Sequence, residues 1–254
     1  MNIGVYLGSF NPPHIGHLNC LYQALDTKVI DKVLVVPAFK NPWKSKPTDA
    51  FDPTSHDGMS LDEEFFLRHN LCNAMFKDLI DEGKVHVSDI EYSIWRSEHK
   101  YADDCIYSHE TLSAIKTRAS QCLGCWDSVV DPETMELREK TKIFLITTVE
   151  TLVTIPDWKE GKWILSSFPI LAMKTDSLER DKEDYVLGNP ANIELVKGVP
   201  TVEMSDIPIH STAIRDKFLR CKAIRPYVNK ATEKIMIDKR AKLVHLYEAI
   251  AKHK

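Results

Sequence analysis

Two histidines follow the first apolar segment of the chain, within a run of small and rigid residues. The run reads Gly8-Ser9-Phe10-Asn11-Pro12-Pro13-His14-Ile15-Gly16-His17-Leu18. Gly8 lets the backbone approach a ligand closely, and the prolines stiffen the turn. His17 is predicted to open a helix, whose free N–H groups and positive dipole end suit a phosphate. Two imidazoles there can donate hydrogen bonds to the same phosphate, and Gly16 between them permits close packing. The pattern predicts a phosphate-binding turn.

A second run of this kind lies late in the chain. It reads Ile207-Pro208-Ile209-His210-Ser211-Thr212-Ala213-Ile214-Arg215. Ser211 or Thr212 is typical of an N-cap, so a helix is expected to start there and to expose a second set of N–H groups. Arg215 would lie one turn into that helix, where its guanidinium can bind phosphate oxygens in bidentate fashion.

Several familiar sites are absent from the sequence. There is no G-x-x-x-x-G-K-[ST] phosphate loop and no G-x-G-x-x-G dinucleotide motif. Cys122 and Cys125 form a single C-x-x-C, and a structural zinc site needs four ligands, so we interpret them as unliganded thiols in an inserted loop and expect no protein-held metal site.

Composition limits the class of protein. The 254 residues suit one large domain, 43% of them hydrophobic and 28% charged, as in ordinary globular chains. The net charge of −4 argues against a nucleic-acid-coating protein. No run approaches the ~18 apolar residues of a membrane span, and the amino-terminal residues lack the features of a signal peptide. We therefore expect a cytoplasmic protein with free thiols and no membrane or nucleic-acid partner; a homo-oligomer is left open.

The elements that must position these residues alternate between strand and helix. Candidate strands are Asn2–Leu7, Lys32–Pro37, Lys84–Ile90, Lys142–Thr147, Ile170–Lys174 and Thr201–Met204. Candidate helices are His17–Leu25, Leu61–Leu79, Thr111–Ala119 and Ala231–Ala251. Short apolar strands between helices predict an α/β fold, a mostly parallel sheet with helices on both faces. We expect one domain over residues 1–254 with a C-terminal helical portion from about residue 205, ligands at the carboxyl ends of the strands, and surface loops near 40–60 and 121–139.

The two motifs together resemble those of the nucleotidylyltransferase superfamily, G-[ST]-F-[DN]-P-x-H-x-G-H and S-[ST]-x-I-R. Between them, three segments resemble those of nicotinate-nucleotide adenylyltransferases in the same order, and a fourth follows the arginine motif. These segments are Val36–Lys44, Tyr107–Leu112, Glu150–Trp158 and Arg225–Val228. The resemblance spans nearly the whole chain. It implies a Rossmann-like fold and transfer of AMP from ATP to nicotinamide or nicotinate mononucleotide, with release of pyrophosphate, in NAD synthesis.

The resemblance also implies roles for individual residues. His14, His17, Lys44 and Arg215 would be catalytic. The resemblance places ATP against Gly8, Ser9, Phe10, His14, Gly16, His17, Ile209, Ser211, Thr212 and Arg215. The acceptor mononucleotide would meet Lys44, Ser108, Glu150 and Trp158, with the tryptophan stacked on the pyridine ring, where cation–π attraction is available. Mg²⁺ would enter with ATP, bound mainly through the triphosphate and water.

Departures from the family pattern fall mainly on the acceptor side. Asn11 stands where aspartate is common, Trp43 replaces a histidine, and the run Thr147-Thr148-Val149-Glu150 stands where the family has a glycine and an aspartate. Two alternatives therefore stay open. One is a nucleotidyltransferase that uses CTP or a different phosphorylated acceptor, such as phosphopantetheine. The other is a non-catalytic nucleotide sensor on the same fold. A tRNA synthetase fragment is excluded because its lysine-rich second motif is missing.

Overall fold

The protein is built around a parallel sheet of six strands in the order β3-β2-β1-β4-β5-β6. The computed structural model describes residues 1–40, 59–98, 105–117, 140–175, 189–204 and 209–252. The strands are β1 (Asn2–Gly8), β2 (Lys32–Pro37), β3 (Val85–Val87), β4 (Lys142–Thr148), β5 (Ile170–Thr175) and β6 (Thr201–Met204). Every neighbouring pair is parallel. The predicted fold class is confirmed.

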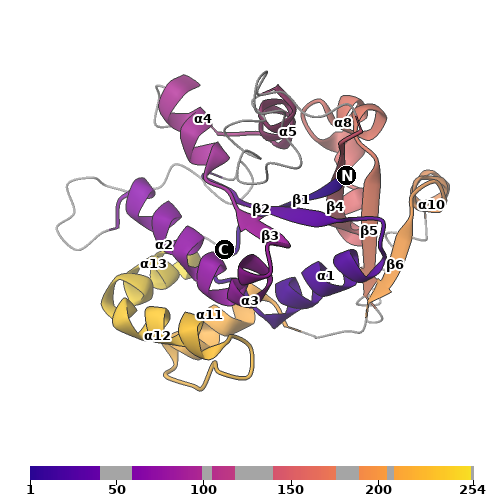
Figure 1. The fold of residues 1–254 in the computed structure, drawn as a ribbon. Helices are drawn as coiled ribbons and strands as arrows, with labels where there is room; N and C mark the ends of the chain where they lie inside the picture. The colour runs from indigo at the N-terminus through magenta and orange to yellow at the C-terminus, as the bar shows by residue number, and fades with distance from the viewer. Residues whose placement is uncertain (41–58, 99–104, 118–139, 176–188, 205–208, 253–254) are drawn as a thin grey trace.

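Helices cover both faces of the sheet, as Figure 1 shows. They are α1 (Ile15–Asp26), α2 (Leu61–Met75), α3 (Lys77–Asp81), α4 (Ile90–Glu98), α5 (Ser108–Thr117), α7 (Val149–Leu152), the 3₁₀ helix η2 (Ile155–Asp157), α8 (Gly161–Ser167), α10 (Pro190–Lys197), α11 (Ser211–Leu219), α12 (Lys230–Asp238) and α13 (Arg240–Lys252). One apolar core joins α1, α2, α11, α12 and α13 to one face of the sheet. A second core joins α4, α5, α7 and α8 to the opposite face. Such double coverage explains why the strands are continuous apolar runs.

Three predicted elements differ from the structure by more than a shift of their ends. The strand expected over Lys84–Ile90 is only Val85–Val87, because the Ser88 hydroxyl accepts the N–H of Ile90 and helix α4 begins there. The helix expected over Leu61–Leu79 is broken at Phe76 into α2 and α3. The helix expected over Ala231–Ala251 is broken at Lys239. The helix breaks there because α12 packs on α2 whereas α13 packs on α11, and one straight helix could not make both contacts.

The strand order reverses beside β1, which has β2 on one side and β4 on the other. The loops that leave the carboxyl ends of β1 and β4 therefore emerge side by side and continue to opposite faces of the sheet. Such a switch point is where open α/β sheets bind their ligands. The first histidine motif follows β1 directly, so the chain order alone places it there.

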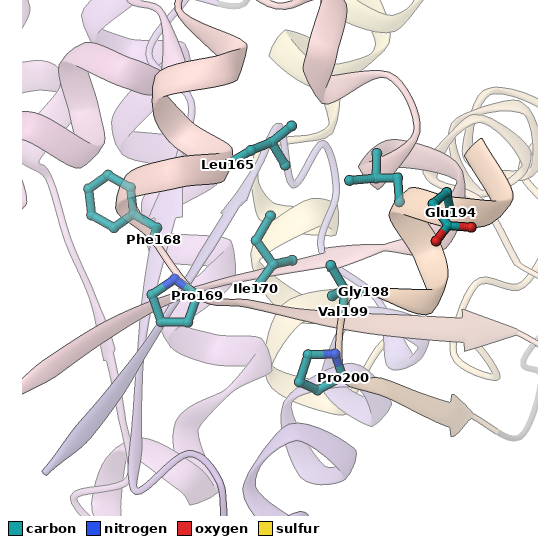
Figure 2. Close-up of a pocket in the computed structure, with 9 residues that line it drawn as sticks. Leu165, Phe168, Pro169, Ile170, Glu194, Gly198, Val199 and Pro200 are labelled. Carbon is teal, nitrogen blue, oxygen red and sulfur yellow. The ribbon is translucent and has the colours of Figure 1, made fainter. Parts of the chain in front are cut away.

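A cavity of about 400 Å³ lies at the opposite, amino edge of the sheet (Figure 2). Its lining includes Phe168 and Ile170 at the start of β5, and Val199 and Pro200 just before β6. The wall is mostly apolar, and Glu194 of α10 supplies a carboxylate. Because β5 and β6 begin here, the cavity is separate from the switch point.

Candidate active site

The turn after β1 folds back on the sheet through Phe10. This residue has a backbone φ of 45° and is almost fully buried, with its ring edge-on to Tyr6, His17 and Phe76. A Cβ on Gly8 would come within 2.9 Å of the Phe10 ring, so only glycine fits there without displacement. The buried Phe10 thereby anchors the segment that carries both histidines.

Helix α1 begins with a capping box made of the two histidines themselves. His14 is the N-cap, and its Nδ1 accepts the N–H of Gly16 at 3.1 Å. The Nδ1 of His17 accepts the N–H of His14 at 3.2 Å. The prediction that His17 opens the helix is wrong by two residues, since Ile15 is the first helical residue. The helix begins earlier because the imidazole of His14 accepts a backbone N–H, as the side chain of a serine or aspartate N-cap usually does.

This capping box fixes the proton positions on both rings. Because each Nδ1 accepts a backbone N–H, the hydrogen of the neutral imidazole must sit on Nε2. The rings lie close together, with centroids 3.8 Å apart. Burial lowers the pKa of His14 to about 4, and the Coulomb interaction with the nearby His210 side chain acts in the same direction. At neutral pH, His14 is therefore an uncharged Nε2–H donor.

Lowering the pH from 7 to 4.5 is expected to reduce the free energy of unfolding. The unfolded histidine has a pKa near 6.5, above the folded value of about 4, so the unfolded chain binds a proton first. The contribution of His14 is complete above pH 6.5 and falls by up to about 3 kcal/mol toward pH 4. Burial also lowers the pKa of His69 and His86, which act in the same direction.

Urea denaturation between pH 4.5 and 7 measures this effect. His14→Gln removes one titrating group, so its unfolding free energy should vary less with pH than that of the wild type. If the unfolding free energy changed equally with pH in the two proteins, His14 would have an ordinary pKa in the folded state.

Helix α11 starts against the first motif, although about 200 residues separate the two in sequence. The Ser211 hydroxyl donates to the carbonyl of Pro12 at 2.9 Å. Arg215 donates from Nη1 to the carbonyl of Asn11 at 2.6 Å and from Nη2 to the Thr212 hydroxyl at 3.0 Å. The N-cap is His210 rather than the predicted Ser211 or Thr212, because the Ser211 hydroxyl bonds across to the first motif. Two helix N-termini therefore meet at one place.

Close packing joins the two motifs beside Gly16. A Cβ on Gly16 would lie 3.0 Å from the His14 imidazole and 3.8 Å from Ile209. Ile209 is buried, whereas Thr212 is exposed. Burial lowers the pKa of Arg215, which nevertheless stays far above neutrality in any protein. The junction thus holds a permanent cation, two imidazole donors and backbone N–H groups, a set that suits a chain of phosphates.

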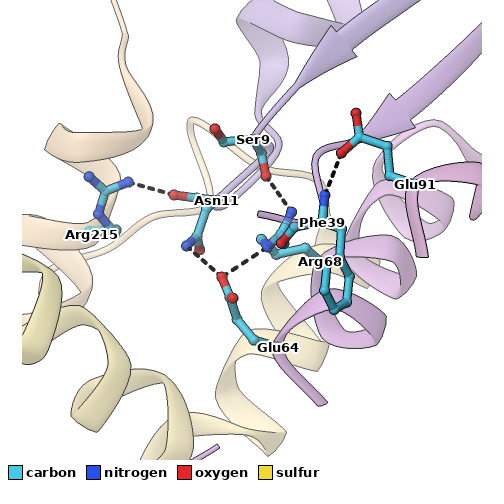
Figure 3. A network of polar contacts seen from close by, with 7 residues as sticks. All are labelled: Ser9, Asn11, Phe39, Glu64, Arg68, Glu91 and Arg215. Carbon is cyan, nitrogen blue, oxygen red and sulfur yellow. Dashed lines mark hydrogen bonds and ion pairs between the residues drawn. The ribbon is translucent and has the colours of Figure 1, made fainter. Parts of the chain in front are cut away.

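A buried ion pair lies beneath this junction (Figure 3). Arg68 bonds from Nε to Glu64 at 3.0 Å and from Nη1 to the carbonyl of Ser9 at 2.9 Å. Glu64 also accepts from the side chain of Asn11 at 3.5 Å. In the sequence Glu64 and Arg68 form an ordinary i,i+4 pair, which is usually solvated. Only the tertiary fold shows that this pair supports the turn after β1.

Two of the predicted acceptor residues, Ser108 and Trp158, lie on segments that touch each other. Ser108 is the first residue of α5, whose start is capped by Glu110 accepting the Tyr107 N–H at 2.7 Å. Lys159 Nζ lies 4.3 Å from the centroid of the Tyr107 ring, so the segment carrying Trp158 packs at the start of α5. The structure thereby brings the surroundings of Ser108 and Trp158 together.

Trp158 is half-buried, and its indole N–H donates to the Thr154 hydroxyl at 3.1 Å. That bond fixes the orientation of the indole ring. Glu150 lies in α7, directly after β4, and therefore at the same edge of the sheet as the histidines. Lys44, Trp43, Cys122 and Cys125 lie outside the described residues. Among the residues that are described, no helix is long and apolar enough to cross a membrane.

Known proteins match this chain in sequence and in fold. The Cytidylyltransferase-like family model matches residues 5–55, which include the first motif. A probable nicotinate-nucleotide adenylyltransferase of Fusobacterium nucleatum is 27% identical over 93% of this chain and 97% of its own length. One from Cytophaga hutchinsonii is 25% identical over 94% of this chain and 97% of its own.

Solved structures agree at the level of the fold. A Plasmodium falciparum nicotinic acid mononucleotide adenylyltransferase complexed with APC superposes with a TM-score of 0.58 at 15% identity, over 97% of both chains. The same enzyme complexed with NaAD gives a TM-score of 0.60 with the same identity and coverage. This chain is therefore similar to nicotinate-nucleotide adenylyltransferases in sequence and shares the fold of the solved adenylyltransferases. Its strand order, its histidine motif after β1 and its late arginine motif form one connected arrangement.

Proposed function

We propose that this protein is a nucleotidylyltransferase that joins AMP from ATP to a pyridine mononucleotide and releases pyrophosphate, a step of NAD synthesis. The observation that carries the proposal is the junction of the two helix N-termini, made by the Ser211–Pro12 and Arg215–Asn11 bonds. The two relatives named above are described as probable nicotinate-nucleotide adenylyltransferases and match this chain over nearly their whole length, which favours nicotinate over nicotinamide as the acceptor ring.

The reaction is an in-line displacement at the α-phosphorus of ATP. A phosphate oxygen of the mononucleotide forms the new P–O bond, and the bond to the bridging oxygen of the β-phosphate breaks. Catalysis then consists of positioning and of stabilising the negative charge that spreads over the phosphates. His14 and His17 would donate from Nε2 to these oxygens, and the start of α1 would add its N–H groups. Arg215 would hold the β- and γ-phosphates, with the start of α11.

Mg²⁺ fits this arrangement as a companion of ATP. In the part of the chain that is described, no group of three His, Cys, Asp or Glu side chains gathers to hold a metal. The cationic and N–H donors would instead face the triphosphate, whose oxygens are the ligands that Mg²⁺ prefers. When bound there, the metal would neutralise part of the charge on the departing pyrophosphate.

The acceptor would lie between α5 and the segment after β4. Trp158 would present the face of its indole to the pyridinium ring, since its N–H is already bonded to Thr154. Ser108 would line the same pocket from the start of α5, Glu150 would bond ribose hydroxyls, and Lys44 would meet the mononucleotide phosphate.

Pyrophosphate release by the purified protein tests the proposal. Nicotinate mononucleotide and nicotinamide mononucleotide are supplied separately with ATP and Mg²⁺, and the dinucleotide is identified by mass spectrometry. We expect release with nicotinate mononucleotide, at a higher kcat/KM than with the amide. Phosphopantetheine, and CTP in place of ATP, serve as controls.

Other outcomes would replace the proposal. Release with phosphopantetheine alone would assign a different acceptor and would remove the role of Trp158. ATP binding measured by calorimetry, without release on any acceptor, would indicate the nucleotide sensor.

A further inference from the structure

A buried carboxylate, Glu91, links two segments on the acceptor side. It lies in the first turn of α4 and is 5% exposed. Its Oε2 accepts the backbone N–H of Phe39 at 2.7 Å, and its Oε1 accepts the Thr111 hydroxyl at 2.9 Å. Phe39 follows β2, whereas Thr111 lies in the first turn of α5. The first of these bonds is drawn in Figure 3.

Packing alone does not account for a glutamate at this position. Its neighbours Ile90, Ile94, Leu112 and Phe39 belong to one apolar core, where an aliphatic side chain would avoid the cost of desolvation. Burial raises the pKa of Glu91 to about 7, which is the sign of that cost. Both of its hydrogen bonds are to neutral groups, and nearby Arg68 donates instead to the carbonyl of Phe39, at 3.4 Å. The carboxylate provides two hydrogen-bond acceptors at once, and these hold two separate segments of the chain at a fixed distance.

The two segments are those that lead to proposed acceptor residues. After Phe39 the chain continues through buried Lys40, whose Nζ lies 5.6 Å from the centroid of the Trp95 ring, toward Lys44. Thr111 is three residues after Ser108, in the same first turn of α5. Movement of Glu91 would therefore shift the segment at Phe39 and the first turn of α5 together. The capping box of α1 and the Arg215 contacts involve other residues.

We propose that Glu91 is a positioning residue for the acceptor, holding the segment after β2 and the start of α5 at the spacing that the mononucleotide requires. The inference rests on the proposed function and goes beyond it by naming a residue that acts without touching either substrate.

Steady-state kinetics of Glu91→Ala and Glu91→Gln test this role. We expect Glu91→Ala to raise the KM for the mononucleotide at least about tenfold, with the KM for ATP changed less than about twofold, since misplacement by about 1 Å carries penalties of this order. Glu91→Gln should restore most of the affinity. Its amide oxygen can accept from Phe39, and its amide nitrogen can donate to Thr111, whose hydroxyl then turns to the Tyr107 carbonyl, 3.5 Å away. Glu98→Ala, exposed at the end of the same helix, is the matched control.

A second readout is independent of turnover. Amide hydrogen exchange at Phe39 should be slow in the wild type and in Glu91→Gln, and much faster in Glu91→Ala, because the N–H loses its buried acceptor. If Glu91→Ala does not fold, Thr111→Val replaces it, with Thr111→Ser as the control that keeps the hydroxyl. Thr111→Val alone should then raise the KM for the mononucleotide.

The results separate failure of this inference from failure of the proposed function. An active wild type with an unchanged mononucleotide KM in a folded Glu91→Ala, or with equal rises for both substrates, would overturn the inference alone. A wild type that transfers AMP to no mononucleotide would overturn both.

Discussion

Replacing His17 by alanine is expected to lower kcat/KM for pyrophosphate release by about 10²–10³-fold, the usual effect of removing one donor that faces developing charge. The imidazole does two things in the structure. Its Nδ1 caps the N–H of His14, and its Nε2 carries the hydrogen that we propose to face the phosphates. Alanine removes both.

Two further variants separate the cap from the donor. In His17→Asn the side-chain oxygen can take the place of Nδ1 and keep the cap, but nothing replaces the Nε2–H. In His17→Gln an amide N–H can reach the Nε2 position. We therefore expect His17→Asn to be nearly as inactive as His17→Ala while unfolding at close to the wild-type temperature, and His17→Gln to recover part of kcat. Full activity in His17→Asn would mean that His17 serves the fold alone.

Arg68→Met should be the most destabilising of the substitutions considered. It removes the bonds to Glu64 and to the carbonyls of Ser9 and Phe39, and it leaves the Glu64 carboxylate, whose side chain is 12% exposed, without its cation. Breaking a buried pair from one side costs about 3–5 kcal/mol. For a chain of this length that corresponds to a fall in Tm of roughly 6–20 °C.

The chain contains a matched control for this prediction. Lys77 and Asp81 form an i,i+4 ion pair at 2.6 Å whose side chains are 62% and 59% exposed. Lys77→Met should lower the Tm far less, because solvent screens an exposed pair and such pairs add little to stability. Arg68→Met combined with Glu64→Met should regain part of the lost stability, because no unpaired charge is then left buried. Calorimetric Tm values for the four proteins decide the matter; equal losses for Arg68→Met and Lys77→Met would contradict the role given to the buried pair.

Much of the fold follows from local patterns in the sequence. Each predicted strand lies on an observed one, because buried parallel strands are short apolar runs whose ends are marked by polar residues or proline, as at Pro37. The helix breaks at Phe76 and Lys239 were missed because periodicity continues across them. Helix α12 ends where it does because α2 and α11 lie in different places, and a local sequence pattern carries no information about the positions of other helices. The single non-helical residue at Lys239 lets α13 turn toward α11.

The residues of the candidate site also fall into two groups, those that a local sequence pattern reveals and those that only the fold reveals. The two motifs were visible because their residue types are unusual at that spacing, and the structure brings them together. Arg68 and Glu91 were not, since a charged residue in a helix ordinarily points to solvent and only the fold buries these two. His14 as an N-cap was also missed, because imidazole is an uncommon cap and the sequence does not show which ring nitrogen faces the backbone.

The contact between Arg215 and Asn11 has a consequence during synthesis. About 200 residues separate the two halves of the phosphate junction, and ribosomes add about 5–20 residues per second. The first histidine turn is therefore made roughly 10–40 s before the arginine that completes it. A nascent chain, or a fragment cut short before α11, would lack the cationic half of the proposed nucleotide site. Under the proposed function, affinity for ATP would arise only after α11 has been made, and nucleotide binding would stabilise molecules that contain α11 in preference to shorter ones.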